Sequence, residues 1–411
     1  MKSVRMVLSA VLAVVTAVSW AGEGPGTLIS LTQGNNEFAV NLYKQLAAAN
    51  KGNIFCSPYS ISSALAMTYS GAAGETAREM AKVLRFHAPG ARLHEGFADL
   101  IGSLNAEGKR GKIELSVANA LWGQKGYGFK KGFLDLTRRY YGAGLHEQDF
   151  FKDAEASRRT INAWVERETR DKIKELIAPG VLNGSTRLVL TNAIFFKGQW
   201  VSQFKKGNTK NEPFHKGAGK DISVALMKQT AEFGYMETPE FQALELPYVG
   251  NRLSMVVFLP NQAEGLGALE AQLSYKNLTG WLGRLRHCEV EVYLPRFKTT
   301  SEFQLKSYLR SMGMKAAFTP PSGKFRPQEA DFSGMDGKRD LYISVVVHKA
   351  FVDVGEEGTE AAAATAVLVD KMMSLPSSVP VFRADHPFLF LIRDKDSGSI
   401  LFLGRMSDPT G

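Results

Sequence analysis

Two hydrophobic periodicities divide this chain into a largely helical first half and a strand-rich second half. Apolar residues recur at helical spacing over residues 37–49 and 60–71, and over 154–177 one stripe is apolar while the rest is charged. Strand-like runs occur at residues 112–122, 187–196, 243–246, 253–259, 289–294, 343–354, 388–392 and 400–403. No Pro/Gly/Ser-rich linker and no internal repeat separates these segments. This order predicts one α+β domain with large, mainly antiparallel sheets.

The N-terminal segment has the pattern of a signal peptide. Lys2 and Arg5 precede a mostly apolar run over residues 6–18, and Ser19-Trp20-Ala21 then supplies small residues at the first and third positions. The run is shorter than the roughly 20 residues that span a bilayer. We therefore expect residues 1–21 to be removed, and residues 22–411 to form a single secreted or periplasmic domain without a membrane attachment.

Charge and cysteine content argue against several classes of partner. The net charge of +9 falls to +7 on cleavage, since two basic residues and no acid are lost, and the remaining Lys and Arg are scattered in twos and threes. No nucleic-acid partner is therefore expected. Cys56 and Cys288 each lie in an apolar run, which favours two buried thiols, with one disulfide as the open alternative.

The sequence contains no convincing catalytic constellation. Seven His and two Cys show no spacing typical of a zinc site, and no complete dinucleotide or P-loop glycine pattern is present. Ser202 and Lys205 match the Ser-x-x-Lys pattern of penicillin-recognising hydrolases, with Lys298-Thr299-Thr300 as a second element. The Ser-Asp element, Ser407-Asp408, comes after both of these, whereas it should lie between them. We expect neither enzyme activity nor a metal or cofactor.

The most unusual segment spans residues 355–369 and contains four consecutive alanines. In a strand, its odd positions from 359 to 369 would be Thr, Ala, Ala, Thr, Val and Val, while Glu360 and Asp370 would lie on the other face. One face is thus uncharged and small or β-branched. Such a segment can be extended in solvent or buried in the middle of a sheet without stranding a charge; a helix fragment is the plain alternative.

This segment resembles the hinge and reactive loop of inhibitory serpins. Further signatures of that family occur in the family's order, at residues 53–61 (NIFCSPYSI), 191–200 (TNAIFFKGQW), 294–297 (LPRF), 347–350 (VHKA) and 384–390 (ADHPFLF). The resemblance covers essentially the whole chain from about residue 34 to 409. It implies a large central β-sheet, two smaller sheets, eight or nine helices and an exposed reactive loop over residues 355–376.

The resemblance also implies a function that needs no catalytic group. A target serine protease of the elastase, chymotrypsin or trypsin type attacks the loop and forms an acyl-enzyme; cysteine proteases are a further class of target. The cleaved loop then inserts into the central sheet and traps the protease. A monomer without cofactors is expected. The alternative is a non-inhibitory serpin acting as a binding or chaperone module, although residues 361–365 lack the charged, bulky or Pro residues common in such relatives.

Three groups of site residues carry over by motif. The family spacing from Gly358 places the reactive bond between Met372 and Met373, with Lys371 as the alternative residue before the bond. The hinge comprises Glu356, Gly358, Thr359, Glu360, Ala361, Ala362, Ala363, Ala364 and Thr365. The entry point of the loop and the polar cluster beneath the parting strands comprise Trp200, Arg296, Ser57, Ser60, Asn192 and His348.

Two of these assignments have a specific expectation attached. Glu356 is expected to face Arg296 across strands at the hinge. Ser57 and Ser60 can equally be hydrogen-bonded core residues without a role in loop insertion.

Overall fold

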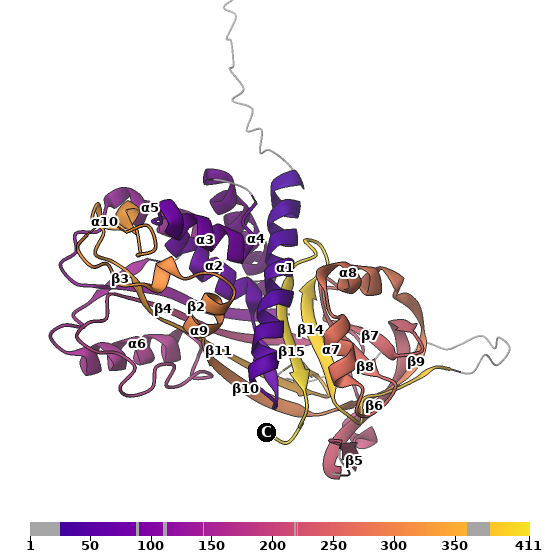
Figure 1. The fold of residues 1–411 in the computed structure, drawn as a ribbon. Coiled ribbons are helices and arrows are strands. Elements are labelled where there is room, and N and C mark those ends of the chain that lie inside the picture. The colour runs from indigo at the N-terminus through magenta and orange to yellow at the C-terminus, as the bar shows by residue number, and fades with distance from the viewer. Residues whose placement is uncertain are drawn as a thin grey trace, which may run out of the picture.

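A computed structural model describes residues 25–87, 90–109, 113–142, 144–217, 219, 221–324, 326–359 and 379–411 (Figure 1). Its described part contains ten α-helices, one or two more than the resemblance implies, and the shortest has four residues. The helices are α1 Pro25–Ala49, α2 Pro58–Tyr69, α3 Gly74–Leu84, α4 Ala91–Lys109, α5 Lys131–Tyr141, α6 Ala154–Glu168, α7 Leu266–Gln272, α8 Tyr275–Arg284, α9 Lys306–Ser311 and α10 Ser333–Asp336, with 3-10 turns η1 Lys206–Asn208 and η2 Ala316–Phe318.

A six-stranded sheet forms the centre of the α-helical half of the molecule. Its strands lie in the order β10 Phe297–Gln304, β11 Ile343–Gly355, β12 Gly358–Thr359, β4 Leu188–Gln199, β2 Ile113–Gln124 and β3 Leu145–Gln148. The strands β11 and β4 also pair with each other directly, in parallel, from Ile343 opposite Leu188 to Phe351 opposite Phe195. The two-residue strand β12 therefore occupies only one end of the space between them.

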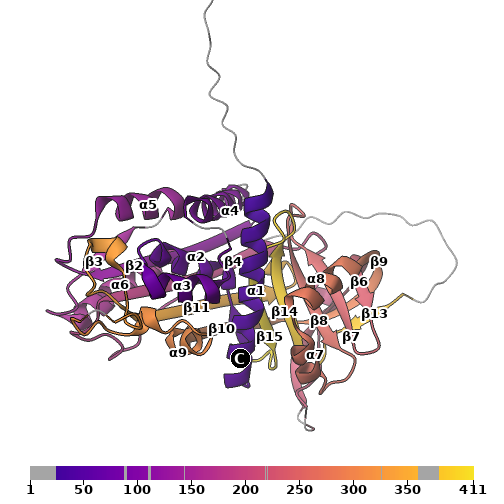
Figure 2. The ribbon, with the colours of Figure 1, turned by 45° about the horizontal axis from the view of Figure 1, so that its top comes forward.

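A nine-stranded sheet forms the other half (Figure 2). Its order is β1 Ile54–Cys56, β15 Ile400–Met406, β14 Phe388–Asp394, β8 Leu253–Pro260, β7 Phe241–Pro247, β6 Asp221–Glu237, β9 Arg286–Pro295 and β13 Val381–Arg383, with β5 Lys210–His215 also on β6. The two smaller sheets expected from the sequence are joined here, because the 17-residue strand β6 pairs with both β9 and β7.

The six-stranded sheet is covered on both faces. Even-numbered residues of β11 such as Ala350 and Val352 belong to the apolar core between the sheets, whereas Val347 packs with Ile161 and Val165 of α6 on the opposite face. This follows from the alternation of side chains along a strand. Helix α6 and the segment after it thus lie over the strands β4, β2 and β11.

Two expected helix boundaries are wrong. Helix α6 ends at Glu168 instead of residue 177, because Arg170 and Asp171 adopt left-handed φ values of 49° and 61°. Helix α1 is described from Pro25, twelve residues before the expected start. Asn35 and Asn36 are poor helix formers, so the sequence did not indicate that the helix continues through them. Both are buried in the structure: Asn35 accepts a hydrogen bond from Ser62, and Asn36 donates one to the Gly398 carbonyl.

The cysteines are partly as expected. Both are free, which excludes the disulfide, but Cys288 is only half-buried because it lies on the outer strand pair β6–β9, whereas Cys56 is fully buried. Within the described residues, no helix is long and apolar enough to cross a membrane. That part of the chain also holds no group of three or more His, Cys, Asp or Glu placed to bind a metal ion.

Candidate functional site

The candidate site begins where strands β4 and β11 separate. Beyond Phe351 and Phe195 these strands no longer pair directly, and β12 lies between them, antiparallel to both. Thr359 is paired with Val354 on one side and Gly198 on the other, and Gly358 is paired with Gly355 and Gln199. The start of the hinge is therefore already a third strand at this end of the sheet.

Gly358 is required by the space available to it. Its φ is +148°, and an added Cβ would lie 2.1 Å from the carbonyl oxygen of Gly198 and 2.6 Å from Cα of Gln199. Because real Cβ atoms do not come this close to backbone atoms, a side chain here would force β12 out of the sheet. The glycine therefore fixes which residue of the hinge lies opposite Gly198.

Thr359 points into the core beneath the hinge. It is fully buried, and its Oγ1 lies 2.9 Å from the hydroxyl of Tyr248. Trp200, predicted from its motif, stacks on the Tyr248 ring at 4.5 Å between centroids and 15° between planes. Its indole Nε1 donates to the Gly355 carbonyl at 3.0 Å, and its backbone N donates to the Glu357 carbonyl at 3.0 Å. Trp200 thus supports the turn that leads into β12.

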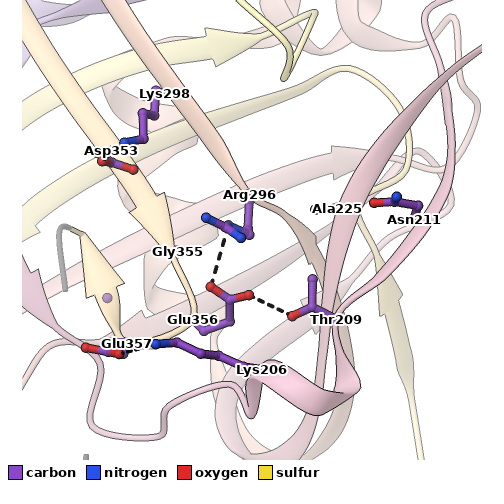
Figure 3. A pocket seen from close by; sticks show the side chains of 11 residues that line it. Lys206, Thr209, Asn211, Ala225, Arg296, Lys298, Asp353, Gly355, Glu356 and Glu357 are labelled. Carbon is purple, nitrogen blue, oxygen red and sulfur yellow. Dashed lines mark hydrogen bonds and ion pairs between the residues drawn. The ribbon is translucent and has the colours of Figure 1, made fainter. Parts of the chain in front are cut away.

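Charged side chains surround an open pocket of about 640 Å³ beside this turn (Figure 3). The Arg296 Nε lies 3.5 Å from Glu356 Oε2, as the sequence suggested, and Thr209 donates to the other oxygen of Glu356 at 2.9 Å. Lys206 pairs with Glu357 at 2.9 Å. Both residues of the turn between β11 and β12 are therefore held by side chains from outside the sheet.

The predicted polar cluster lies beneath the paired part of β4 and β11. His348 and Asn192 are directly opposed residues of these two strands, and the His348 Nδ1 contacts Asn192 Oδ1. The backbone N of Ser57 donates to His348 Nε2 at 3.1 Å, and Asn192 Nδ2 donates to Ser60 Oγ at 2.5 Å. The cluster therefore ties the start of helix α2 to both strands.

The protonation state of His348 follows from this geometry. Its side chain is fully buried, and burial lowers its pKa to about 3. A neutral ring with the proton on Nδ1 donates to Asn192 and accepts from Ser57, which satisfies both nitrogens. A second proton would break the bond from Ser57.

Several residues of the site were not found from the sequence. Tyr248 and Thr209 lie in loops or at strand ends, and Lys206 begins the 3-10 turn η1, so none of the three has a pattern of its own. Asn119 of β2, which accepts from Ser60 at 3.0 Å, follows an ordinary strand pattern. Only Gly198 carried a usable signal, since a glycine inside a strand indicates close backbone approach.

The remaining predicted residues lie outside the described part of the chain: Glu360, Ala361, Ala362, Ala363, Ala364, Thr365, Lys371, Met372 and Met373. Described chain ends at Thr359 in the six-stranded sheet and resumes at Val379, followed by strand β13 on the edge of the nine-stranded sheet.

Comparisons with known proteins agree with this arrangement. A family model described as Serpin (serine protease inhibitor) matches residues 33–409. The leukocyte elastase inhibitors of Bos taurus and Homo sapiens are each 44% identical over 388 residues, which cover 92% of this chain and 99% of those proteins. Serpin B6 of Macaca fascicularis is 44% identical over 385 residues, again 92% of this chain and 99% of that protein.

Solved structures show the same fold. Serpin48 of the insect Tenebrio molitor has a TM-score of 0.81 and 34% identity, and the match covers 92% of this chain and 98% of that one. Uncleaved ovalbumin has a TM-score of 0.82 and 30% identity, with 92% and 100% covered. The matching family is described as one of serine protease inhibitors, not of enzymes. This chain belongs to the serpin family of serine protease inhibitors.

Proposed function

We propose that this serpin is an exported suicide inhibitor, which traps a serine protease by inserting its cleaved reactive loop between strands β4 and β11. The observation that carries the proposal is the position of β12. Gly358 and Thr359 already pair with both strands at the end where these separate. Insertion of the cleaved loop would therefore extend β12, a strand that is already present.

The pairing of β12 defines which side chains would enter the core. Each further residue advances one step along both neighbours, so Ala361 would oppose Val352 and Thr365 would oppose His348 and Asn192. Because directly paired residues share a face, the odd positions would join Thr359 on the buried side. These are the small and β-branched residues of the sequence, whereas Glu360 and Asp370 would lie on the opposite face.

Strand exchange supplies a reason for insertion to be favourable. The direct contact between β4 and β11 is parallel, and an inserted strand would replace it with two antiparallel pairings, which are slightly more stable per residue. Each inserted residue costs roughly 1–2 kcal/mol of backbone entropy. New ladder hydrogen bonds of about 1 kcal/mol each and apolar burial worth about 25 cal/mol per Å² offset that cost.

The covalent step belongs to the protease. Its serine attacks the carbonyl of Met372, an ester forms, and the amine of Met373 leaves with a proton. Insertion before water hydrolyses the ester would leave the protease attached. This serpin supplies only the loop and the sheet that receives it.

The residue before the bond suggests the class of target. Met372 suits elastase-like and chymotrypsin-like pockets, whereas Lys371 would suit trypsin-like ones. The names of the leukocyte elastase inhibitors, 44% identical to this chain, favour an elastase-like protease.

Removal of residues 1–21 would release this single domain as a monomer outside the cytoplasm. The expected finding is a secreted product whose N-terminus is Gly22.

Incubation with elastase-, chymotrypsin- and trypsin-like proteases tests the mechanism. We expect a complex that survives denaturant, and Thr359→Arg should abolish it by placing a charge in the fully buried site of Thr359. The loop should still be cleaved at a similar rate. The matched control Glu360→Arg, on the other predicted face, should inhibit nearly as well as the parent.

Two results would refute the proposal. If the parent is cleaved but never forms the complex, the chain is a non-inhibitory binding or chaperone module. If Thr359→Arg traps protease as efficiently as the parent, loop insertion is not the mechanism.

A further inference from the structure

We infer that Tyr248 is a positioning residue for loop insertion, which fixes the register of the entering strand by holding the hydroxyl of Thr359. The inference rests on the proposed insertion mechanism and assigns a role to a residue outside the sequence motifs. Tyr248 follows strand β7, and its hydroxyl lies 2.9 Å from Thr359 Oγ1, with both residues fully buried.

The Tyr248 ring is held in place by contacts other than the one with Thr359. It is stacked on Trp200, and its edge meets Phe196 with 4.9 Å between ring centroids. A Cβ added at Gly198 would lie 2.8 Å from Tyr248 Cδ1, so the ring packs directly on the backbone of β4. The backbone N of Tyr248 donates to Leu253 at 2.9 Å. The hydroxyl therefore has a defined position and cannot follow a strand that enters elsewhere.

That position makes the hydrogen bond specific to one register. A slip by one residue would turn every side chain of the entering strand to the other face. Either Gly358, which has no side chain, or the carboxylate of Glu360 would then face Tyr248 instead of Thr359. The first leaves a buried hydroxyl without a partner, and the second brings a charge toward the apolar core.

The register of β12 is thus set by a hydrogen bond at Thr359 and by a steric restriction at Gly358. Gly358 excludes wrong registers by clash, because only glycine fits opposite Gln199 and against the Gly198 carbonyl. The hydrogen bond between Tyr248 and Thr359 stabilises the correct register of the entering strand while the protease is still attached as an ester. Loss of this bond should shift the competition between insertion and hydrolysis without altering attack on the reactive bond.

Hydroxyl-deletion variants test this role. Tyr248→Phe should raise the ratio of cleaved, untrapped inhibitor to complex about fivefold, the factor corresponding to ~1 kcal/mol for one hydrogen bond. Thr359→Val should raise it at least as much, since it leaves the Tyr248 hydroxyl unpaired, and the rate of loop cleavage should stay at the parent value. Thr359→Ser, which keeps a hydroxyl, should stay near the parent ratio.

The double variant and a matched control separate this role from general destabilisation. Because both changes remove one bond, Tyr248→Phe with Thr359→Val should be no worse than Thr359→Val alone. Tyr235→Phe removes a tyrosine hydroxyl bonded to Glu237, away from the hinge, and should leave the ratio unchanged.

Several results would refute the role of Tyr248. A parent that traps protease while Tyr248→Phe traps it equally well would overturn the role of Tyr248 and leave the insertion mechanism standing. Additive effects in the double variant would also overturn it, since the two residues would then act separately. A parent that forms no complex removes the proposed function and this inference with it. If Tyr248→Phe fails to fold, Thr359→Val and Thr359→Ser still decide.

Discussion

Acidification should weaken the closed pairing of β4 and β11, because His348 is buried between them as a neutral ring. Burial lowers its pKa to about 3, whereas an exposed histidine in the unfolded chain titrates near 6.5. Between these values the unfolded state holds one more proton than the native state. The free energy of unfolding therefore falls as the pH falls through this window.

The size of the effect follows from the window. A pH of 5.0 is about 1.5 units below the pKa of a histidine in the unfolded chain. At 1.36 kcal/mol per unit, His348 should therefore lower the free energy of unfolding by ~2 kcal/mol at this pH. His94 contacts the Tyr141 hydroxyl at 2.6 Å and has a pKa lowered by burial to about 4. It should contribute a similar amount, also about 2 kcal/mol at pH 5.0.

The assay compares urea unfolding at pH 7.5 and 5.0 for the parent and His348→Gln. A glutamine can still accept a hydrogen bond from Ser57 but cannot take up a proton, so the variant should lose about 2 kcal/mol of the parent's pH dependence. His94→Gln is the matched control, because it removes another buried histidine with a lowered pKa, one that lies on helix α4 and not on β4 or β11. An unaltered pH dependence in His348→Gln would show that His348 is not held neutral in the native state.

Further predictions concern the loop and its glycine. Mass spectrometry after stoichiometric protease treatment should show a new N-terminus at Met373; a unique cut after Val369 would refute the predicted register. Complete cleavage of the loop should raise the melting temperature, because insertion adds a strand, and an unchanged melt would argue for a non-inhibitory serpin. Gly358→Ala should raise the fraction of untrapped, cleaved inhibitor, since its Cβ would lie 2.1 Å from the Gly198 carbonyl; full trapping would contradict the observed pairing of β12.

The family and the overall fold class could be predicted from the sequence because their signals are local or ordered along the chain. Strand periodicity at residues 187–196 and 343–354 predicted most of β4 and β11. The segment at residues 154–177 misled, because its apolar stripe continues through Ile173 and Ile177 after α6 has ended. Both side chains stay buried although left-handed residues redirect the backbone. Apolar periodicity therefore indicates the burial of these side chains but not the turn in the backbone.

The contacts around the hinge depended on the tertiary structure. Motifs identified Trp200, Arg296 and Glu356, but nothing in the sequence placed Tyr248 beneath Thr359, since these residues are 111 positions apart and meet only when β7 packs under the end of β4. The sequence alone determined that residues 359–369 have one uncharged face, because alternation is a property of the strand itself. Which strands receive Thr359, and which side chain holds it, is decided by how distant strands pair.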